Sequence, residues 1–186
     1  MKLIAGVDEA GRGALAGPVV AAAVILPDEY DLAGLNDSKK VSPLKREKLF
    51  GKITNQAISI GVGIVSSHEI DKINILESTY KAMKISLERL KPFPDEALID
   101  GFPLTTQVIP NRGIIKGDEK IDVIKAASII AKVTRDSIML EYDMQYPMYA
   151  FKNHKGYGTK EHIKLLQLHK PCNIHRKTFK PVSSLV

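Results

Sequence analysis

The spacing of apolar and polar residues predicts strands early in the chain and alternating helix and strand after them. Apolar runs that are rich in β-branched residues and bounded by glycine, proline or polar clusters are typical of strands. Six runs fit this description: residues 2–8, 19–26, 57–65, 97–99, 108–109 and 114–115. Gly17 and Pro18 separate the first two runs, and we expect these two strands to pair as a hairpin.

Other segments combine helical spacing of apolar residues with helix start signals. The residues in N-cap position are Ser42, Ser66, Asn74 and Thr159. We expect a helix after each cap, with Leu44 on the apolar face of the first and Leu76 on that of the third. The longest helix is expected over residues 122–145, where apolar residues occur on several faces, and Pro147 ends it.

These elements predict one α/β domain over residues 1–186, built on a mixed β-sheet flanked by helices. A chain of 186 residues has the length of a single domain, and 44% hydrophobic residues supply a sizeable core. The last part of the chain, from about residue 150 to 186, is predicted to be a short, basic helical segment. Its basic residues and histidines are Lys152, His154, Lys155, Lys160, His162, Lys164, His169, Lys170, His175, Arg176, Lys177 and Lys180.

The charge and the cysteine content narrow the class of protein. A formal net charge of +6 suits an acidic partner such as nucleic acid. However, most basic proteins of this size simply carry their charged residues on a solvated surface. The single cysteine, Cys172, leaves no internal disulfide and fits a reducing compartment. No apolar run has the length of a membrane span, and no secretory signal precedes the first strand. We therefore expect a cytoplasmic protein with no membrane segment.

Four acidic residues follow apolar strand runs. Asp8 and Glu9 end the first run, Asp100 ends the fourth, and Asp118 follows the last. Ligands of α/β sheets collect at the carboxyl ends of strands, where four carboxylates would repel one another unless cations held them. Carboxylate oxygens are the ligands that Mg²⁺ and Mn²⁺ prefer. The four acids therefore predict a divalent metal site.

Two alternatives to this site stay open on the residues alone. Each acid by itself is also explained as a turn former or a helix cap. In addition, consecutive strand residues face opposite sides, so Asp8 and Glu9 cannot both line one site in a regular strand. We expect the strand to end or twist at these residues, which Gly11 and Gly13 would allow.

Two other kinds of site are disfavoured. Residues 11–16 match the dinucleotide-binding pattern Gly-x-Gly-x-x-Ala, but Pro18 and a β-branched run stand where that site needs a helix. The histidines of the basic segment have no spacing typical of metal ligands. Asp136, on the long helix, fits either the metal site or the helix surface.

Six motifs, in order along nearly the whole chain, resemble those of ribonuclease HII, the type 2 ribonuclease H family. The first is Asp-Glu-Ala-Gly-Arg-Gly at residues 8–13, which is a strong motif by itself. The others lie at residues 36–40, 99–101 with 116–118, 126–136, 155–159 and 175–182. Departures from the family pattern are small: Asn36 in the second motif, and Lys177, Thr178 and Lys180 in the last.

The resemblance implies a ribonuclease H-like fold and a metal-dependent endoribonuclease. Such an enzyme cleaves the RNA strand of RNA–DNA hybrids and nicks duplex DNA on the 5′ side of a single ribonucleotide. It implies that Asp8, Glu9, Asp100 and Asp118 are catalytic and bind Mn²⁺ or Mg²⁺ for two-metal hydrolysis, which leaves 5′-phosphate and 3′-hydroxyl ends.

The resemblance also implies the residues that bind the substrate. Gly11, Arg12 and Gly13 would read the 2′-hydroxyl of the ribonucleotide, and Tyr157 would pack on the adjacent deoxyribose. Lys39 and Lys40, with the basic segment, would hold phosphates. The partners would be RNA–DNA hybrid and ribonucleotide-containing duplex DNA, and we expect a monomer. The alternative function is a non-catalytic nucleic-acid binding module, which would need the basic residues but not the acids.

Overall fold

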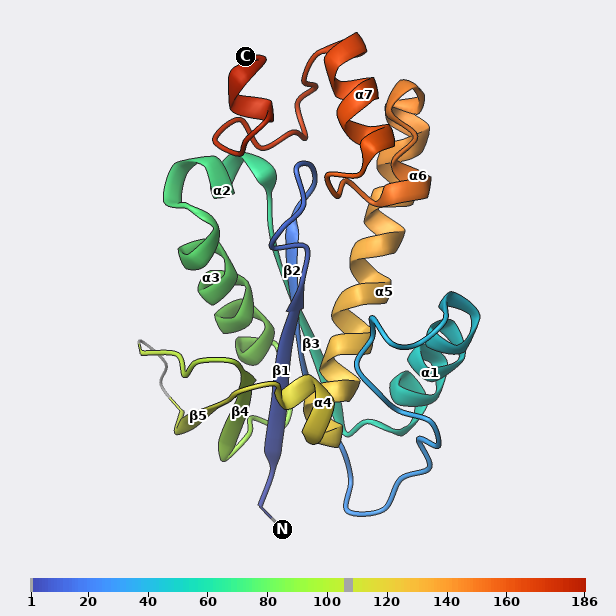
Figure 1. Ribbon diagram of the computed structural model, residues 1–186. Helices are drawn as coiled ribbons and strands as arrows, with labels where there is room; N and C mark the ends of the chain where they lie inside the picture. Colours follow the sequence, from blue (N-terminus) through green and yellow to red (C-terminus); the bar gives the residue numbers. More distant parts are fainter. Residues whose placement is uncertain (1, 106–108) are drawn as a thin grey trace.

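The computed structural model describes residues 2–105 and 109–186, and a five-stranded sheet lies at its centre (Figure 1). The strand order is β3-β2-β1-β4-β5. The strands are β1 (Ile4–Ala10), β2 (Val19–Ile25), β3 (Ser59–Val65), β4 (Glu96–Asp100) and β5 (Asn111–Ile114). The predicted strand at residues 108–109 involves Val108, which lies outside the described residues. Otherwise each predicted strand is present, with ends that move by a few residues.

The pairing of the strands brings the carboxyl ends of β1 and β4 to one edge. β1 and β2 are antiparallel, with Ala5 opposite Ile25, which confirms the predicted hairpin. β1 and β4 are parallel, with Val7 opposite Ile99. The sheet is therefore mixed, as predicted, and the residue after Val7 lies beside the residue after Ile99.

Helices cover both faces of the sheet (Figure 1). They are α1 (Pro43–Gln56), α2 (Ser67–Ile73), α3 (Ile75–Glu88), α4 (Gly117–Lys120), α5 (Asp122–Gln145), α6 (Phe151–His154) and α7 (Lys160–His169), with short 3-10 helices at Pro147–Tyr149 and Val182–Ser184. One apolar core joins α2 and α3 to β1, β2 and β4. A second core joins α1 and α5 to the opposite face of β2.

All four predicted N-cap residues precede their helices, but Ser42 makes no side-chain cap hydrogen bond, and two predicted core positions are wrong. The side chains of Ser66, Asn74 and Thr159 accept hydrogen bonds from backbone amides of the first turn of their helices. Leu44 and Leu76 are 65% and 44% exposed, although their spacing matches the apolar faces of α1 and α3. Each lies in the first turn of its helix.

Backbone hydrogen bonds join the connection between β1 and β2 to the C-terminal part of the chain. The Leu15 amide donates to the Gly156 carbonyl at 2.8 Å, and the Gly17 amide donates to the Ile174 carbonyl at 2.9 Å. β2 then begins at Val19, where a dinucleotide site would need a helix, so that hypothesis is wrong. No helix in the described ranges is long and apolar enough to cross a membrane.

Candidate active site

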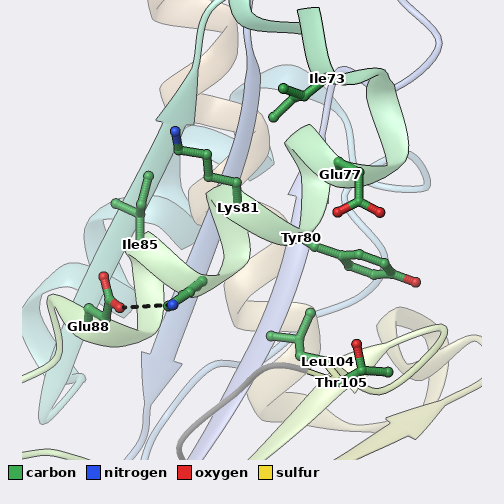
Figure 2. A pocket seen from close by; sticks show the side chains of 9 residues that line it. Ile73, Glu77, Tyr80, Lys81, Ile85, Glu88, Leu104 and Thr105 are labelled. Carbon is green, nitrogen blue, oxygen red and sulfur yellow. Dashed lines mark ion pairs between the residues drawn. The ribbon is translucent and has the colours of Figure 1, made fainter.

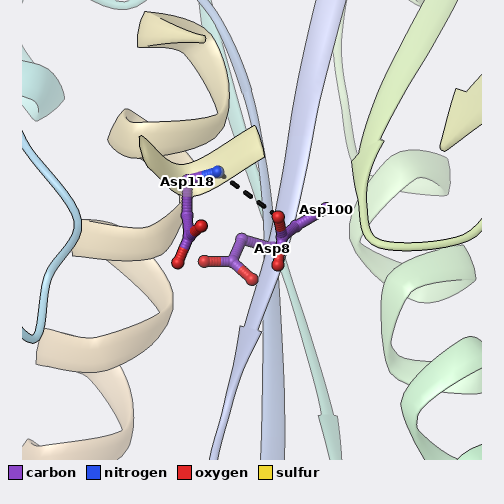
Figure 3. Close-up of side chains that lie close together, drawn as sticks. All are labelled: Asp8, Asp100 and Asp118. Atoms are coloured by element: carbon purple, nitrogen blue, oxygen red, sulfur yellow. Dashed lines mark hydrogen bonds between the residues drawn. The ribbon is translucent and has the colours of Figure 1, made fainter. Parts of the chain in front are cut away.

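Three of the four predicted acids lie together at the edge of the sheet (Figure 3). Asp8 is on β1, Asp100 is the last residue of β4, and Asp118 is on α4, which follows β5. Each offers a carboxylate oxygen, and these three oxygens lie within 4.8 Å of one another. The parallel pairing of β1 with β4 places Asp8 beside Asp100, and the turn after β5 brings Asp118 back to them.

The turn into α4 is held by the carboxylate of Asp100. Its Oδ1 accepts hydrogen bonds from the Gly117 amide at 2.7 Å and from the Asp118 amide at 3.3 Å. Lys116, just before them, has a left-handed backbone with a φ of 56°. Asp100 therefore fixes the position of the neighbouring acid while one of its own oxygens stays free of these bonds.

The crowding of the acids changes their protonation. Burial, then the charges of Glu9 and Asp100, raise the pKa of Asp8 well above its usual value. Burial, then the charge of Asp100, raise the pKa of Asp118 as well. A cluster of this kind favours either protons or a cation, because the ionised carboxylates repel one another.

The donor set fits a hard divalent cation. All three side chains offer carboxylate oxygen, which Mg²⁺ and Mn²⁺ prefer, and Asp8 is 5% exposed. Among the residues that the structure describes, no other group of three acids, histidines or cysteines brings its ligand atoms this close.

Glu9 takes a different position from the one expected. β1 continues as a regular strand to Ala10, so the predicted end or twist of the strand at Asp8 and Glu9 is wrong. Asp8 faces α5, while Glu9 lies on the α3 side, in a cavity of about 310 Å³ that Asp100 also lines. Burial raises the pKa of Glu9, and the Arg12 guanidinium, 3.4 Å from its Oε1, opposes that shift. Asp100 is thus the acid that both sides share.

The loop that follows β1 is held from beneath by two buried arginines. Arg176 donates to the carbonyls of Gly11, at 2.6 Å, and Arg12, at 2.8 Å. Arg135 donates to the carbonyls of Ala16 and Pro18 at 3.0 and 2.9 Å. Both arginines are 0% exposed. The shape of the loop therefore depends on two side chains from α5 and the C-terminal segment.

The outer side of this loop is open. A Cβ built on Gly13 would meet no atom within 4 Å. Within the part of the chain that the structure describes, the amides of Arg12 and Gly13 have no hydrogen-bond acceptor. The loop carbonyls of residues 11 and 12 point inward to Arg176, so the loop presents amide donors to a ligand.

Tyr157 lies next to the same loop. It forms an isolated antiparallel bridge with Ala14, and the guanidinium carbon of Arg135 lies 5.0 Å from the centre of its ring. The Nζ of Lys132 lies 5.6 Å from that centre. The half-buried ring is thus fixed by cations on α5, beside the Gly11–Gly13 backbone.

Of the two predicted phosphate ligands, Lys39 lies closer to the acids. Burial lowers its pKa, but the carboxylates of Asp37, Asp8, Asp118 and Glu9 outweigh that effect and raise the pKa. Lys40 pairs with Glu119 at 3.1 Å. The loop that carries both lysines is held by Arg46, which donates to the Ser38 carbonyl, and by the Ser128 hydroxyl, 2.9 Å from the Ser38 hydroxyl.

Other candidates from the basic segment and α5 do not reach the site. Asp136 pairs with Lys132 at 2.7 Å and with Arg46 at 3.7 Å, and it lies outside the three-acid group. His154, His162, His175 and Arg176 are buried, so they cannot belong to an exposed basic face. Sequence reasoning missed the roles of Arg135 and Arg176, because arginine is rarely buried.

Another cavity lies away from the acids (Figure 2). It has a volume of about 670 Å³ and runs along α3, between Tyr80, Lys81 and Leu104. Lys84 and Glu88 form an ion pair of 3.9 Å on its wall. None of the four acids lines it, so its size gives no reason to place the chemistry there.

Comparison with known proteins identifies the family of the chain. A family model described as Ribonuclease HII matches residues 5–182. The chain belongs to the ribonuclease HII family. The ribonuclease HII of Acetivibrio thermocellus is 57% identical over 178 residues, which cover 96% of this chain and 70% of that protein. The ribonuclease HII of Enterococcus faecalis is 53% identical over 185 residues, which cover 100% of this chain and 72% of that protein.

The fold agrees as well. The crystal structure of ribonuclease H2 from Pyrococcus horikoshii matches with a TM-score of 0.80 at 28% identity, and the match covers 98% of this chain and 96% of that chain. The predicted ribonuclease H-like fold is confirmed. Membership of the ribonuclease HII family makes the chain a metal-dependent ribonuclease H enzyme. The alternative of a non-catalytic binding module has no support from these findings.

Proposed function

We propose that this ribonuclease HII hydrolyses the RNA strand of RNA–DNA hybrids and nicks duplex DNA on the 5′ side of a single ribonucleotide. The products would carry 5′-phosphate and 3′-hydroxyl ends. The observation that carries the proposal is the group of three carboxylates from β1, β4 and α4, in which Asp8 of β1 lies a few residues before a loop with free backbone amides. Asp8 and the amides of Arg12 and Gly13, which would read the ribose, are thus separated by only a few residues.

Asp8, Asp100 and Asp118 are the residues that would hold the metal, with Glu9 next to Asp100. When bound, divalent ions supply a water of lowered pKa and neutralise charge on the leaving 3′ oxygen. The buried Asp8 and the bonded Asp100 keep the oxygens in place without the reorganisation that exposed side chains would need. Whether Mn²⁺ or Mg²⁺ is used, the ligand atoms are the same carboxylate oxygens.

The Gly11–Gly13 loop is proposed to recognise the ribose. A 2′-hydroxyl can accept from a backbone amide, and deoxyribose lacks this oxygen. The amides of Arg12 and Gly13 are available for such a bond, and the open space at Gly13 lets a sugar approach the backbone. Arg176 supports this role because it holds the carbonyls of the same loop on the inner side.

Tyr157 is proposed to pack on the deoxyribose that follows the ribonucleotide. Its bridge to Ala14 places the ring next to the loop that reads the ribose. An aromatic ring against a sugar favours the apolar deoxyribose face, where a 2′-hydroxyl would lose its hydrogen-bond partners. Loop and ring together would then recognise an RNA-to-DNA junction.

Lys39 and Lys40 are proposed to bind phosphates near the scissile bond. Such contacts supply affinity and salt dependence but no choice of sequence. Lys39 is exposed, and its raised pKa keeps it charged next to the acids. Lys40 has to exchange its partner Glu119 for a phosphate, so it should contribute less.

The test is cleavage of a DNA duplex that contains one ribonucleotide, with an all-DNA duplex as the control. We expect one nick, 5′ to the ribonucleotide, with Mn²⁺ or Mg²⁺, and none with EDTA. Asp8→Asn should abolish the nick, while Asp28→Asn, which removes the same charge from an exposed loop, should not. Cleavage of a long hybrid without a nick at the single ribonucleotide would remove the junction-reading role of the loop and Tyr157.

A further inference from the structure

Three histidines that the proposed reaction does not use form a buried cluster beneath the Gly11–Gly17 loop. His154, His162 and His175 are 6%, 0% and 1% exposed. The rings of His154 and His162 stack with their centres 4.3 Å apart, and Nε2 of His162 lies 3.1 Å from Nε2 of His175. Because solvent does not reach these rings, their hydrogen-bonding partners define which nitrogens carry protons.

The partners define one tautomer for His175 and one for His162. The Cys172 amide donates to Nδ1 of His175 at 3.0 Å, so this nitrogen carries no proton. The proton of a neutral His175 is then on Nε2, which donates to Nε2 of His162. His162 must therefore carry its proton on Nδ1, and this N–H donates to the Tyr157 carbonyl at 2.9 Å. The result is a chain of bonds from Cys172 through both rings to Tyr157.

His154 is fixed in the same way. The Gly156 amide donates to its Nδ1 at 3.2 Å, and its Nε2 donates to the Tyr149 carbonyl at 2.8 Å. In each of the three rings a second proton would face another N–H group: that of Gly156 in His154, of His175 in His162 and of Cys172 in His175. The network therefore fits only if all three histidines are neutral.

The network ends at the residues that line the proposed ribose site. His175 forms an isolated bridge with Ala16, next to the bridge between Ala14 and Tyr157. The Arg176 amide donates to the Leu15 carbonyl at 2.8 Å. The histidine chain thus joins the two segments that flank the loop after β1.

We propose that His162 and His175 are positioning residues that hold Tyr157 against the ribonucleotide loop through a chain of neutral, tautomer-specific hydrogen bonds. This proposal rests on the proposed function, because it assigns Tyr157 to the substrate. The bond to the Tyr157 carbonyl fixes the backbone of that residue, while Arg135 fixes its ring from the other side. The position of the Tyr157 ring then depends on His162, a side chain that does not contact the nucleic acid.

A metal site is a poorer explanation of the cluster. His175 uses Nδ1 toward Cys172 and Nε2 toward His162, so no one ion could take both contacts. The thiol of Cys172 lies 3.1 Å from the same Nδ1, on the side away from His162. The contacts instead match donors to acceptors along the whole chain of bonds.

The first test reads the tautomers directly, by ¹⁵N NMR of the ring nitrogens in the wild-type protein at neutral pH. We expect the proton on Nε2 in His154 and His175 and on Nδ1 in His162. A proton on Nε2 of His162, or a doubly protonated ring among the three, would overturn the proposal. This measurement requires no activity, so it stands whether or not the protein cleaves the proposed substrate.

The second test compares His162→Leu with His162→Asn on the duplex with one ribonucleotide. The Asn amide can donate to the Tyr157 carbonyl from about the place of Nδ1, and Leu cannot. We expect His162→Leu to lower kcat/KM about tenfold and His162→Asn to recover most of that loss. His68→Leu, at an exposed position on α2, is the matched control and should leave kcat/KM unchanged.

A double-mutant cycle with Tyr157→Ala separates positioning from general stability. If His162 acts through the Tyr157 ring, His162→Leu should cause no further loss of kcat/KM once that ring is gone. Losses that multiply in the double variant would contradict the proposal.

If the wild type does not cleave the substrate, the proposed function fails and the ring signals of Tyr157 decide the positioning. They should shift in His162→Leu and return in His162→Asn. Unchanged signals in His162→Leu would overturn the positioning itself.

Discussion

The side chain of Arg135 fills the space that any side chain at Gly11 would need. A Cβ built on Gly11 would lie 2.0 Å from Nε and 2.5 Å from Cδ of Arg135, and the φ of Gly11 is +94°. Arg135 cannot move away easily, because its guanidinium donates to the carbonyls of Ala16 and Pro18. Gly11 is therefore required by the fold, whereas Gly13, with open space around it, is not.

This difference predicts opposite results for two alanine substitutions. Gly11→Ala should lower the free energy of unfolding by about 2–4 kcal/mol, because it adds overpacking to a left-handed backbone. Gly13→Ala should change the free energy of unfolding by less than about 0.5 kcal/mol. It should still reduce cleavage at a single ribonucleotide by about tenfold, because a methyl group keeps the sugar from the loop amides. Urea unfolding and initial rates measure both, and a fully active Gly13→Ala would contradict the proposed role of the loop.

The repulsion among the acids predicts that removing the charge of Asp8 stabilises the protein when no metal is bound. The pKa of Asp8 is raised by burial and by Glu9 and Asp100, so the folded state holds this proton more tightly than the unfolded state. Above the unfolded pKa, ionisation of Asp8 therefore costs stability, and that cost grows as the pH rises. Asp8→Asn should raise Tm in EDTA at neutral pH by about 2–4 °C.

Added Mn²⁺ should make the Tm of the wild type higher than the Tm of Asp8→Asn. It stabilises a protein in proportion to how tightly that protein binds it, so the Tm of the wild type should rise by more than the Tm of Asp8→Asn. Differential scanning calorimetry with and without EDTA checks both expectations. A lower Tm for Asp8→Asn in EDTA would show that the carboxylate has a stabilising partner instead.

The two neighbouring lysines should differ in their effect on substrate affinity. Lys39 lies among the carboxylates of the site, while Lys40 is paired with Glu119. Lys39→Ala should weaken binding of the hybrid, measured with Ca²⁺ in place of the active ion, and should lower the slope of log Kd against log salt by about 1. Lys40→Ala should change the slope less. Equal slopes for Lys39→Ala and the wild type would argue against a phosphate contact at Lys39.

The buried histidines predict a loss of stability in acid. Burial, together with the neighbouring histidines, lowers the pKa of His162 and of His175 from 6.5 to about 4. The unfolded state therefore binds more protons than the folded state between pH 6.5 and 4, and stability falls as the pH falls through this window. Burial also lowers the pKa of His154; among its charged neighbours, Glu161 and Asp143 raise this pKa and Lys155 lowers it.

The comparison variant for this prediction is His162→Asn, which removes one titrating ring. Between pH 7 and 4 the free energy of unfolding of the wild type should fall by up to about 3 kcal/mol more than that of the variant. Urea unfolding at several pH values measures the difference. Parallel pH profiles for the two proteins would show that His162 is not buried in its neutral form.

The elements and the acids of this protein could be predicted from its sequence because their signals are local. A β-branched run, a cap residue and an acid at a strand end all lie within a few positions of one another. The alternation of side chains also raised the difficulty that Asp8 and Glu9 face opposite sides. The structure resolves it by keeping β1 regular and letting Asp100 lie near both acids.

The supports of the loop could not be predicted in this way. Arg135 and Arg176 reach backbone carbonyls 117 and 165 residues away in sequence, and no local pattern records such a contact. The histidine cluster is of the same kind, because its members look like part of a solvated basic segment. Leu44 and Leu76 show the converse error, since helical spacing alone does not say which positions of an apolar face are covered by the rest of the fold.

Calorimetric titration of Mn²⁺ tests whether Asp8, Asp100 and Asp118 form one metal centre. The wild type and Asp28→Asn should bind Mn²⁺ with the same Kd, because Asp28 lies in an exposed loop outside the group. Asp8→Asn, Asp100→Asn and Asp118→Asn should each weaken binding by about tenfold or more. Unchanged binding in all three variants would show that these carboxylates do not hold the metal.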